Sequence, residues 1–161
     1  MASGRNYGLE STLRWLPTSH LELGGSVGLL RTRESGSLTS DGDYVAPRAQ
    51  AHSPEYQLQI NATYRRQGWM ARVDTSAVDA FYFDVPADHD QRSTSYTLTN
   101  IKAGFEAGTW QVHAWMRNVF DEHYATRGFF FANEPPDFPD KLYIQNGDPR
   151  QFGVTLQWSL R

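Results

Sequence analysis

Hydrophobic and polar residues alternate along most of this chain. The segment 56–65 shows the pattern clearly: its apolar positions are Tyr56, Leu58, Ile60, Ala62 and Tyr64, and polar residues lie between them. A period of two is typical of a β-strand with one apolar face. The same alternation covers residues 6–16, 21–29, 69–74, 101–106, 110–117 and 152–160. It predicts an all-β chain of about seven strands without a convincing helix.

Two segments are less regular. Leu9, Leu13 and Leu16 would also fit one face of a helix, so residues 6–16 are ambiguous when considered alone. Tyr96 and Leu98 have the opposite parity to the apolar residues after Asn100, which predicts a β-bulge near Thr99 and Asn100.

The connections between these strands are of two kinds. Residues 17–20, 66–68 and 107–109 are short turns, whereas 34–53, 84–93 and 119–150 are long and polar or rich in Gly and Pro. Short and long connections alternate strictly. This predicts an antiparallel up-and-down meander whose two ends differ, as they do in outer-membrane barrels.

Aromatic residues gather at the strand ends on the apolar parity. Those near a short turn or the chain end are Trp15, Tyr64, Trp69, Phe105, Trp110 and Trp158, and those near a long loop are Tyr7 and Tyr56. Eight residues of tilted strand separate the two sets, which is about 20 Å of height. The spacing matches the aromatic girdles on both sides of an outer-membrane apolar band. A soluble sandwich remains the alternative, but its core has no reason to concentrate rings at strand ends.

The opposite parity is polar and charged. It includes Glu10, Arg14, Gln57, Asn61, Arg65, Arg72, Asp74, Lys102 and Arg117. Each of these charges would cost about 2–4 kcal/mol at the middle of a bilayer if it faced lipid. We therefore expect this face to line a polar lumen.

Composition narrows the choices further. The 161 residues suffice for one domain, with 39% hydrophobic and 14% aromatic residues, and their mean hydropathy is −0.60. A net charge of −3 with interspersed signs provides no basic face for nucleic acid. The absence of cysteine excludes disulfides, thiolate zinc sites and a cysteine nucleophile. No apolar run is long enough for a transmembrane helix, and the N-terminus has no apolar core of a signal peptide.

Two C-terminal motifs resemble those of a known family. The stretch 118–125, Asn-Val-Phe-Asp-Glu-His-Tyr-Ala, resembles the N-L-F-D-x-x-Y motif of TonB-dependent outer-membrane receptors. The stretch 147–154, Gly-Asp-Pro-Arg-Gln-Phe-Gly-Val, is similar to the G-x-P-R-x-[FY]-G sequence that opens their last strand. Asn6, Gly8 and Glu10 are similar to an N-x-G-x-E strand start in the same barrels.

The resemblance implies an architecture larger than this chain. Barrels of the family have twenty-two strands, preceded by a plug domain and a segment that engages TonB. Residues 1–161 therefore correspond to the C-terminal third of such a barrel, and we expect the signal peptide, TonB box and plug to be absent. The implied partners are the outer-membrane bilayer of a Gram-negative bacterium, the rest of the barrel and plug, the TonB complex and the barrel assembly machine. Alone, the fragment is expected to be inactive.

The last strand also resembles the signal read by the barrel assembly machine. The matching positions are Gln151, Gly153, Leu156 and Trp158. Family members usually end on an aromatic residue, whereas this chain continues through Ser159 and Leu160 to Arg161.

Candidate chemistry is sparse. No nucleophile–base pair, phosphate loop or cofactor motif is present, so an enzyme is not expected, and neither is a metal or cofactor. The acidic loop 84–90 could bind calcium but lacks the EF-hand spacing, and a solvated loop is favoured. His113 is interpreted as a lumen histidine rather than a ligand. Glu122 and His123 are interpreted as anchoring a loop.

Ligand capture is the remaining chemistry. Arg127, Phe129, Phe130, Phe131 and Tyr82 lie on the long-loop side, where aromatic rings and a guanidinium could contact a siderophore or another bulky nutrient. Packing of the loops is the competing explanation.

Two other functions fit parts of the pattern. A soluble lipocalin-like carrier suits the length and the meander, but it needs an apolar interior and about eight strands. A small outer-membrane barrel with a structural or adhesive role would also need one more strand. The sequence does not identify the substrate.

Overall fold

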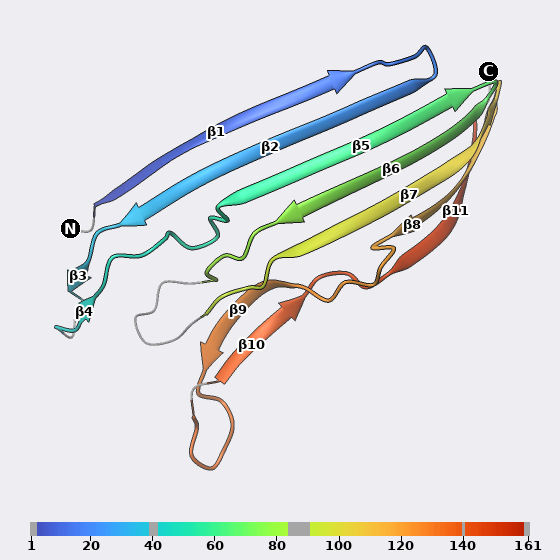
Figure 1. Cartoon of the computed structure of the whole chain (residues 1–161). Helices are drawn as coiled ribbons and strands as arrows, with labels where there is room; N and C mark the ends of the chain where they lie inside the picture. The colour runs from blue at the N-terminus through green and yellow to red at the C-terminus, as the bar shows by residue number, and fades with distance from the viewer. Residues whose placement is uncertain (1–2, 39–41, 84–90, 140, 160–161) are drawn as a thin grey trace.

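Seven long antiparallel strands form one sheet. The structure, a computed structural model, describes residues 3–38, 42–83, 91–139 and 141–159. The strands of the sheet are β1 (Gly4–Trp15), β2 (Leu21–Glu34), β5 (Tyr56–Arg66), β6 (Trp69–Val78), β7 (Tyr96–Ala107), β8 (Trp110–Arg117) and β11 (Gln151–Trp158). Each pairs with the next in the order β1-β2-β5-β6-β7-β8-β11 (Figure 1). The predicted all-β meander of seven strands is confirmed.

Four shorter strands lie on the long-connection side of the sheet (Figure 1). They are β3 (Ser37–Leu38), β4 (Tyr44–Val45), β9 (Ala125–Phe131) and β10 (Lys141–Asn146). The last two pair as an antiparallel hairpin between β8 and β11. Treating residues 119–150 as a loop therefore missed two strands. The described ranges contain no helix that is long and apolar enough to span a membrane.

The polar face of the sheet is its concave face. Thr63, Met70 and His113 are buried, with 2%, 7% and 6% of their surface exposed, and all three belong to the polar parity. Leu13 and Leu156, on the apolar parity, are 69% and 71% exposed. Side chains converge on the inside of a curved sheet and diverge on its outside. The polar side chains therefore point inward, and the apolar ones point outward.

Glycines make room for the large inward side chains. A Cβ on Gly104 would overlap the carbonyl oxygen of Val112 and the ring of His113. A Cβ on Gly153 would lie 2.6 Å from the Trp115 ring on the neighbouring strand. The concave face is thus packed locally even though most of its residues are polar.

The predicted bulge near Thr99 and Asn100 is wrong. Pairing between β6 and β7 runs without a shift from Trp69 opposite Phe105 to Val78 opposite Tyr96. Tyr96 consequently points inward, where its ring stacks on Tyr124 with the centroids 4.5 Å apart. Because Tyr124 provides an aromatic contact on the concave face, Tyr96 can point inward and no bulge is required.

Aromatic residues form a contact row on the outward face beside the short turns. The rings of Trp69 and Phe105 meet edge to face at 5.1 Å, and Phe105 lies 6.3 Å from Trp110. Trp110 is directly opposite Trp158 on β11. Trp15 and Tyr64 lie near the same ends of β1 and β5, while Tyr7 and Tyr56 lie at the opposite ends. Their function as membrane girdles stays a prediction.

The sheet is open. In the described part of the chain, β1 pairs only with β2, and β11 pairs only with β8 (Figure 1). Each of these two strands therefore presents one edge of backbone N–H and C=O groups without a strand neighbour. Such edges are costly wherever water is absent.

Substitution of Gly104 by Ala tests the packing of the concave face. The new methyl group would overlap backbone of the neighbouring strand, which cannot move aside as a flexible side chain can. Overpacking of this kind costs about 1–3 kcal/mol of unfolding free energy. Gly28→Ala is the matched control, because its Cβ would have only the Gln57 carbonyl oxygen at 4.0 Å. Urea unfolding of the whole protein in detergent micelles measures both, and equal midpoints would contradict the packing described.

Candidate functional site

The side chain of Asn118 organises the base of the long segment between β8 and β11. Its Oδ1 accepts from the Glu122 amide at 2.8 Å. Its Nδ2 donates to the carbonyl oxygens of Glu122 and Asp148 at 2.9 and 3.1 Å. Asn118 is buried and has a positive φ of 47°, a conformation that asparagine tolerates better than most residues. One amide therefore closes a turn and fixes the chain that returns to β11.

The two C-terminal motifs dock against each other. Besides Asn118 and Asp148, the Asp121 carboxylate accepts from the Arg150 amide at 2.9 Å and lies 3.8 Å from its guanidinium. The Gly147 amide donates to the Tyr124 carbonyl at 2.8 Å, and a Cβ on Gly147 would overlap the Tyr124 ring. Residues almost thirty positions apart thus form one anchor, and the β9–β10 hairpin extends from it.

A chain of hydrogen bonds connects this anchor to the wall of the sheet. The Asn118 amide donates to Oδ1 of Asn100, whose Nδ2 donates to Asp74 at 2.8 Å. Asp74 in turn accepts from Arg72 at 3.2 Å, and Arg72 also donates to Thr63 at 3.0 Å. This series of hydrogen bonds crosses β7, β6 and β5 on the concave face. It fixes the position of the hairpin base relative to three strands.

The β9–β10 hairpin has two different faces. One carries Arg127, Phe129 and Phe131 on β9 and, directly opposite them, Gln145, Tyr143 and Lys141 on β10. The rings of Phe129 and Phe131 meet at 5.0 Å, and Phe131 lies 6.3 Å from Tyr143. Phe129 and Phe131 remain 43% and 54% exposed. We call these six residues the hairpin face.

Glu134 closes the tip of the hairpin face. Its carboxylate accepts from Lys141 Nζ at 2.9 and 3.0 Å and from the Tyr143 hydroxyl at 2.9 Å. The hydrogen bond from Lys141, followed by that from Tyr143, lowers the pKa of Glu134. Its carboxylate raises the pKa of Lys141 and of Tyr143 through the same hydrogen bonds. The three groups therefore form one hydrogen-bonded cluster, in which the Tyr143 ring also lies 6.3 Å from Phe131.

The other face of the hairpin packs on the loop after β6. Gly128 is buried there, and a Cβ at this position would meet the Phe83 ring. Phe81 and Phe83 are 9% and 4% exposed, and their rings pack at 5.7 Å. Ser93 fixes the loop, since its hydroxyl accepts from the Phe81 amide at 2.9 Å. These two phenylalanines form a small loop core.

The five residues expected to contact ligand do not form one cluster. Arg127, Phe129 and Phe131 share the hairpin face, whereas Phe130 points to the opposite face and is half-buried. Tyr82 is also half-buried and lies beneath the Arg92 guanidinium, 5.5 Å from the ring centroid. Tyr143 was missed, although the alternation of Lys141, Tyr143 and Gln145 is itself a strand signal.

The residues of the expected assembly signal lie along the edge strand β11. Gln151 and Gly153 point inward, while Leu156 and Trp158 point outward and are 71% and 69% exposed. Leu160 and Arg161 lie outside the described residues, as does the acidic loop 84–90. The described ranges contain no group of three or more His, Asp or Glu side chains that could hold a metal ion. His113 Nε2 lies 3.4 Å from the Glu106 carboxylate.

Known structures share this fold. No family model matches the chain. The ferric yersiniabactin uptake receptor FyuA from Yersinia pestis superposes with a TM-score of 0.76 at 19% identity, over 96% of this chain and 23% of the receptor. The siderophore receptor PiuA from Acinetobacter baumannii gives 0.73 at 15% identity, over 95% of this chain and 21% of the receptor.

A third structure agrees with these two. The ferric-catecholate import receptor Fiu from E. coli K12 gives a TM-score of 0.72 at 15% identity, over 96% of this chain and 21% of that chain. The chain therefore has the fold of the barrel part of such receptors, and it spans less than a quarter of their length.

Replacement of Asn118 by Ala tests the anchor. The variant loses the three hydrogen bonds of the Asn118 side chain. It also places an alanine, which disfavours positive φ, at a backbone φ of 47°. We expect about 2–4 kcal/mol of local destabilisation and rapid protease cleavage within residues 119–150, while the seven-stranded sheet stays intact. Asn118→Gly is the control for backbone strain, because it removes the hydrogen bonds but tolerates the φ. Wild-type protease resistance in both variants would contradict the anchor.

Proposed function

We propose that this chain is the C-terminal part of the barrel of a TonB-dependent outer-membrane receptor that imports a siderophore or a similar bulky nutrient. The observation that carries the proposal is the polarity of the sheet: charged side chains face its concave side, and exposed apolar side chains cover its convex side. A soluble protein folds with the opposite polarity. A bilayer outside and water inside are the surroundings that suit this sheet.

The structural neighbours support the same proposal. All three are named as receptors for siderophores or ferric siderophore complexes, and each superposes on 95–96% of this chain. The two C-terminal motifs of this chain have a joint structural function, since each supplies one side of the anchor that holds the segment between β8 and β11. Transport energy would come through TonB, so the chain itself needs no catalytic group.

Transport would require more than these residues. The two free edges of the sheet need further strands before the backbone is satisfied in hydrocarbon. In the proposed receptor those strands, the plug and the TonB-binding segment belong to the rest of the protein. The 161-residue chain alone is then inactive in uptake.

The hairpin face is the proposed ligand-contact surface. It combines three aromatic rings with Arg127 on the side of the sheet where the long connections gather. Rings stack on a planar ligand, and a guanidinium attracts an anionic one. Of the residues expected to contact ligand, we retain Arg127, Phe129 and Phe131 and add Tyr143. Phe130 and Tyr82 fit a packing function better because both are partly covered.

The soluble-carrier alternative fits less well. A lipocalin-like protein binds its ligand in an apolar interior, whereas the concave face here holds Arg72, Asp74 and Lys102. The largest exposed apolar side chains lie outside, where a carrier would present charges to water.

Substitution of Phe129 and Phe131 together by Ala in the whole receptor tests the ligand surface. Loss of two rings from a contact surface should weaken binding about tenfold or more. Cells expressing each variant would be given radiolabelled ferric catecholate and ferric hydroxamate complexes, and both binding and uptake would be measured. Phe120→Ala is the matched control, because Phe120 is 74% exposed and outside the hairpin face.

The outcomes separate the site from the function. Uptake of a ferric complex by the wild type with unchanged affinity in the double variant would overturn the ligand surface alone. Absence of the wild-type protein from the outer-membrane fraction would overturn the receptor proposal itself.

A further inference from the structure

The outward face of β5 to β11 is built from three parallel rows of side chains. Strand register defines each row, since directly opposite residues are neighbours across adjacent strands. The row farther from the short turns consists of Ala62, Val73, Ile101, Met116 and Phe152. The middle row is Tyr64, Ala71, Ala103, Ala114 and Val154. The row at the short turns is Arg66, Trp69, Phe105, Val112 and Leu156.

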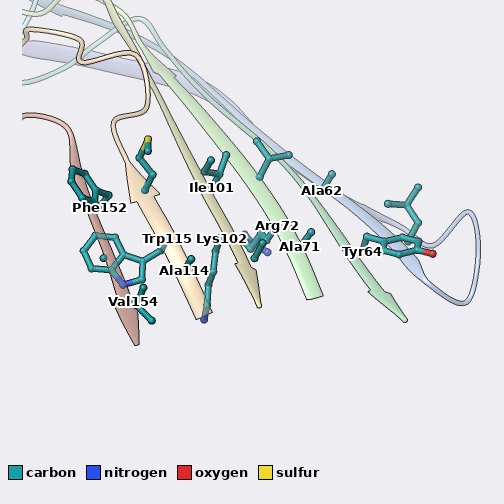
Figure 2. A pocket seen from close by; sticks show the side chains of 15 residues that line it. Ala62, Tyr64, Ala71, Arg72, Ile101, Lys102, Ala114, Trp115, Phe152 and Val154 are labelled. Atoms are coloured by element: carbon teal, nitrogen blue, oxygen red, sulfur yellow. The ribbon is translucent and has the colours of Figure 1, made fainter. Parts of the chain in front are cut away.

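The middle row is the floor of a groove. Three adjacent strands contribute only a methyl group there, at Ala71, Ala103 and Ala114, while both flanking rows carry larger side chains. The structure contains an apolar groove of about 830 Å³ at this place. It is lined by all members of the middle row and of the row farther from the short turns, together with Leu21, Arg72, Lys102, Trp115 and Gly153, whereas the row at the short turns lies outside the lining. Figure 2 shows Phe152 and Val154 at one end of the groove and Tyr64 at the other.

The groove has the dimensions of a lipid chain. Its floor crosses four intervals between neighbouring strands, which is about 19 Å at the usual strand spacing. This is close to the length of an extended fatty acyl chain, and the volume lies within the range of about 300–1,000 Å³ of small-molecule sites. Arg72 also lines the groove, but Asp74 and Thr63 bind its guanidinium group on the concave face.

The groove deepens away from one end. Tyr64 and Ala71 lie two residues from the ends of β5 and β6 at the short turn. Ala103 and Ala114 lie four residues from the corresponding ends of β7 and β8. The β5 end is therefore nearest to the surface of a bilayer that this sheet would span, and the β11 end is farther inside.

A cation lies at the shallow end. Arg66 follows Tyr64 on the outward parity, is directly opposite Trp69, and is exposed. It makes no ion pair with any carboxylate in the described ranges. A phosphate is the anionic group that a bilayer presents at this height, and a guanidinium binds it in a bidentate manner.

We propose that this groove is a binding site for one membrane phospholipid, with an acyl chain on the alanine floor and the phosphate at Arg66. The proposal rests on the membrane location proposed above. A phospholipid fits better than a second copy of the chain, because Arg66, which has no ion pair in the described ranges, follows Tyr64 on the outward face at the shallow end of the groove and suits a phosphate. Trp69 and Phe105 then lie alongside the glycerol region, where aromatic side chains are favoured.

Photocrosslinking tests the site. The whole protein would be purified from outer membranes and reconstituted with phosphatidylethanolamine that carries a photoreactive group in one acyl chain. Peptide mapping after illumination should place the label on residues 62–73 and 101–116. Ala103→Phe fills the floor and should remove most of this label. Arg66→Gln should reduce it about fivefold, the effect of losing one cation at a membrane surface.

Ala77→Phe is the matched control. Ala77 lies on the outward face of β6 and outside the groove, so its substitution by Phe should leave the labelling unchanged. Equal labelling in Ala103→Phe, Arg66→Gln and the control would overturn the site, as would crosslinks between two protein copies at the groove peptides. Arg66→Gln alone decides the question if Ala103→Phe does not assemble. Heat-modifiable migration of the wild type checks insertion separately, and its absence would instead overturn the receptor proposal.

Discussion

Backbone hydrogen bonding is the constraint on which the rest of this structure depends. Inside hydrocarbon, every N–H and C=O group needs a partner within the protein, and neighbouring strands provide it. The seven strands satisfy this condition across six interfaces, and within the described residues they leave it unmet at the outer edges of β1 and β11. In the proposed receptor, further strands complete the backbone hydrogen bonds, so the side chains on each face can match the polarity of the medium that they contact. Apolar residues then cover the outside, and charges line the inside.

The concave face also explains how the long segment between β8 and β11 is held in position. Asn118 binds both ends of the segment between β8 and β11, and the hydrogen bonds through Asn100, Asp74 and Arg72 carry that position to three strands. Such a connected network costs little in stability because each polar group has a partner. The hairpin therefore projects from a hydrogen-bonded base, and its rings Phe129 and Phe131 remain 43% and 54% exposed.

The sequence predicts the sheet well because its two faces differ in polarity along their whole length. Alternation at 56–65 or 152–158 has one consistent phase, so strand identity and facing follow directly. The β9–β10 hairpin was missed because its alternation is short and is interrupted between the two strands by Pro135, Pro136 and Pro139. The bulge near Thr99 was wrong because parity alone does not reveal that Tyr124 is available as an inward partner of Tyr96. The motifs were visible in the sequence, but their mutual docking was not.

Site-directed spin labelling across β6 tests the central claim, that lipid lies outside this sheet and water inside. The chain has no cysteine, so single cysteines at residues 69–78 can be labelled without background. In the whole protein reconstituted into a bilayer, we expect collisions with oxygen to peak at the odd positions from Trp69 to Ala77. Collisions with a water-soluble nickel reagent should peak at the even positions from Met70 to Val78. The opposite phase, or no alternation, would contradict the account.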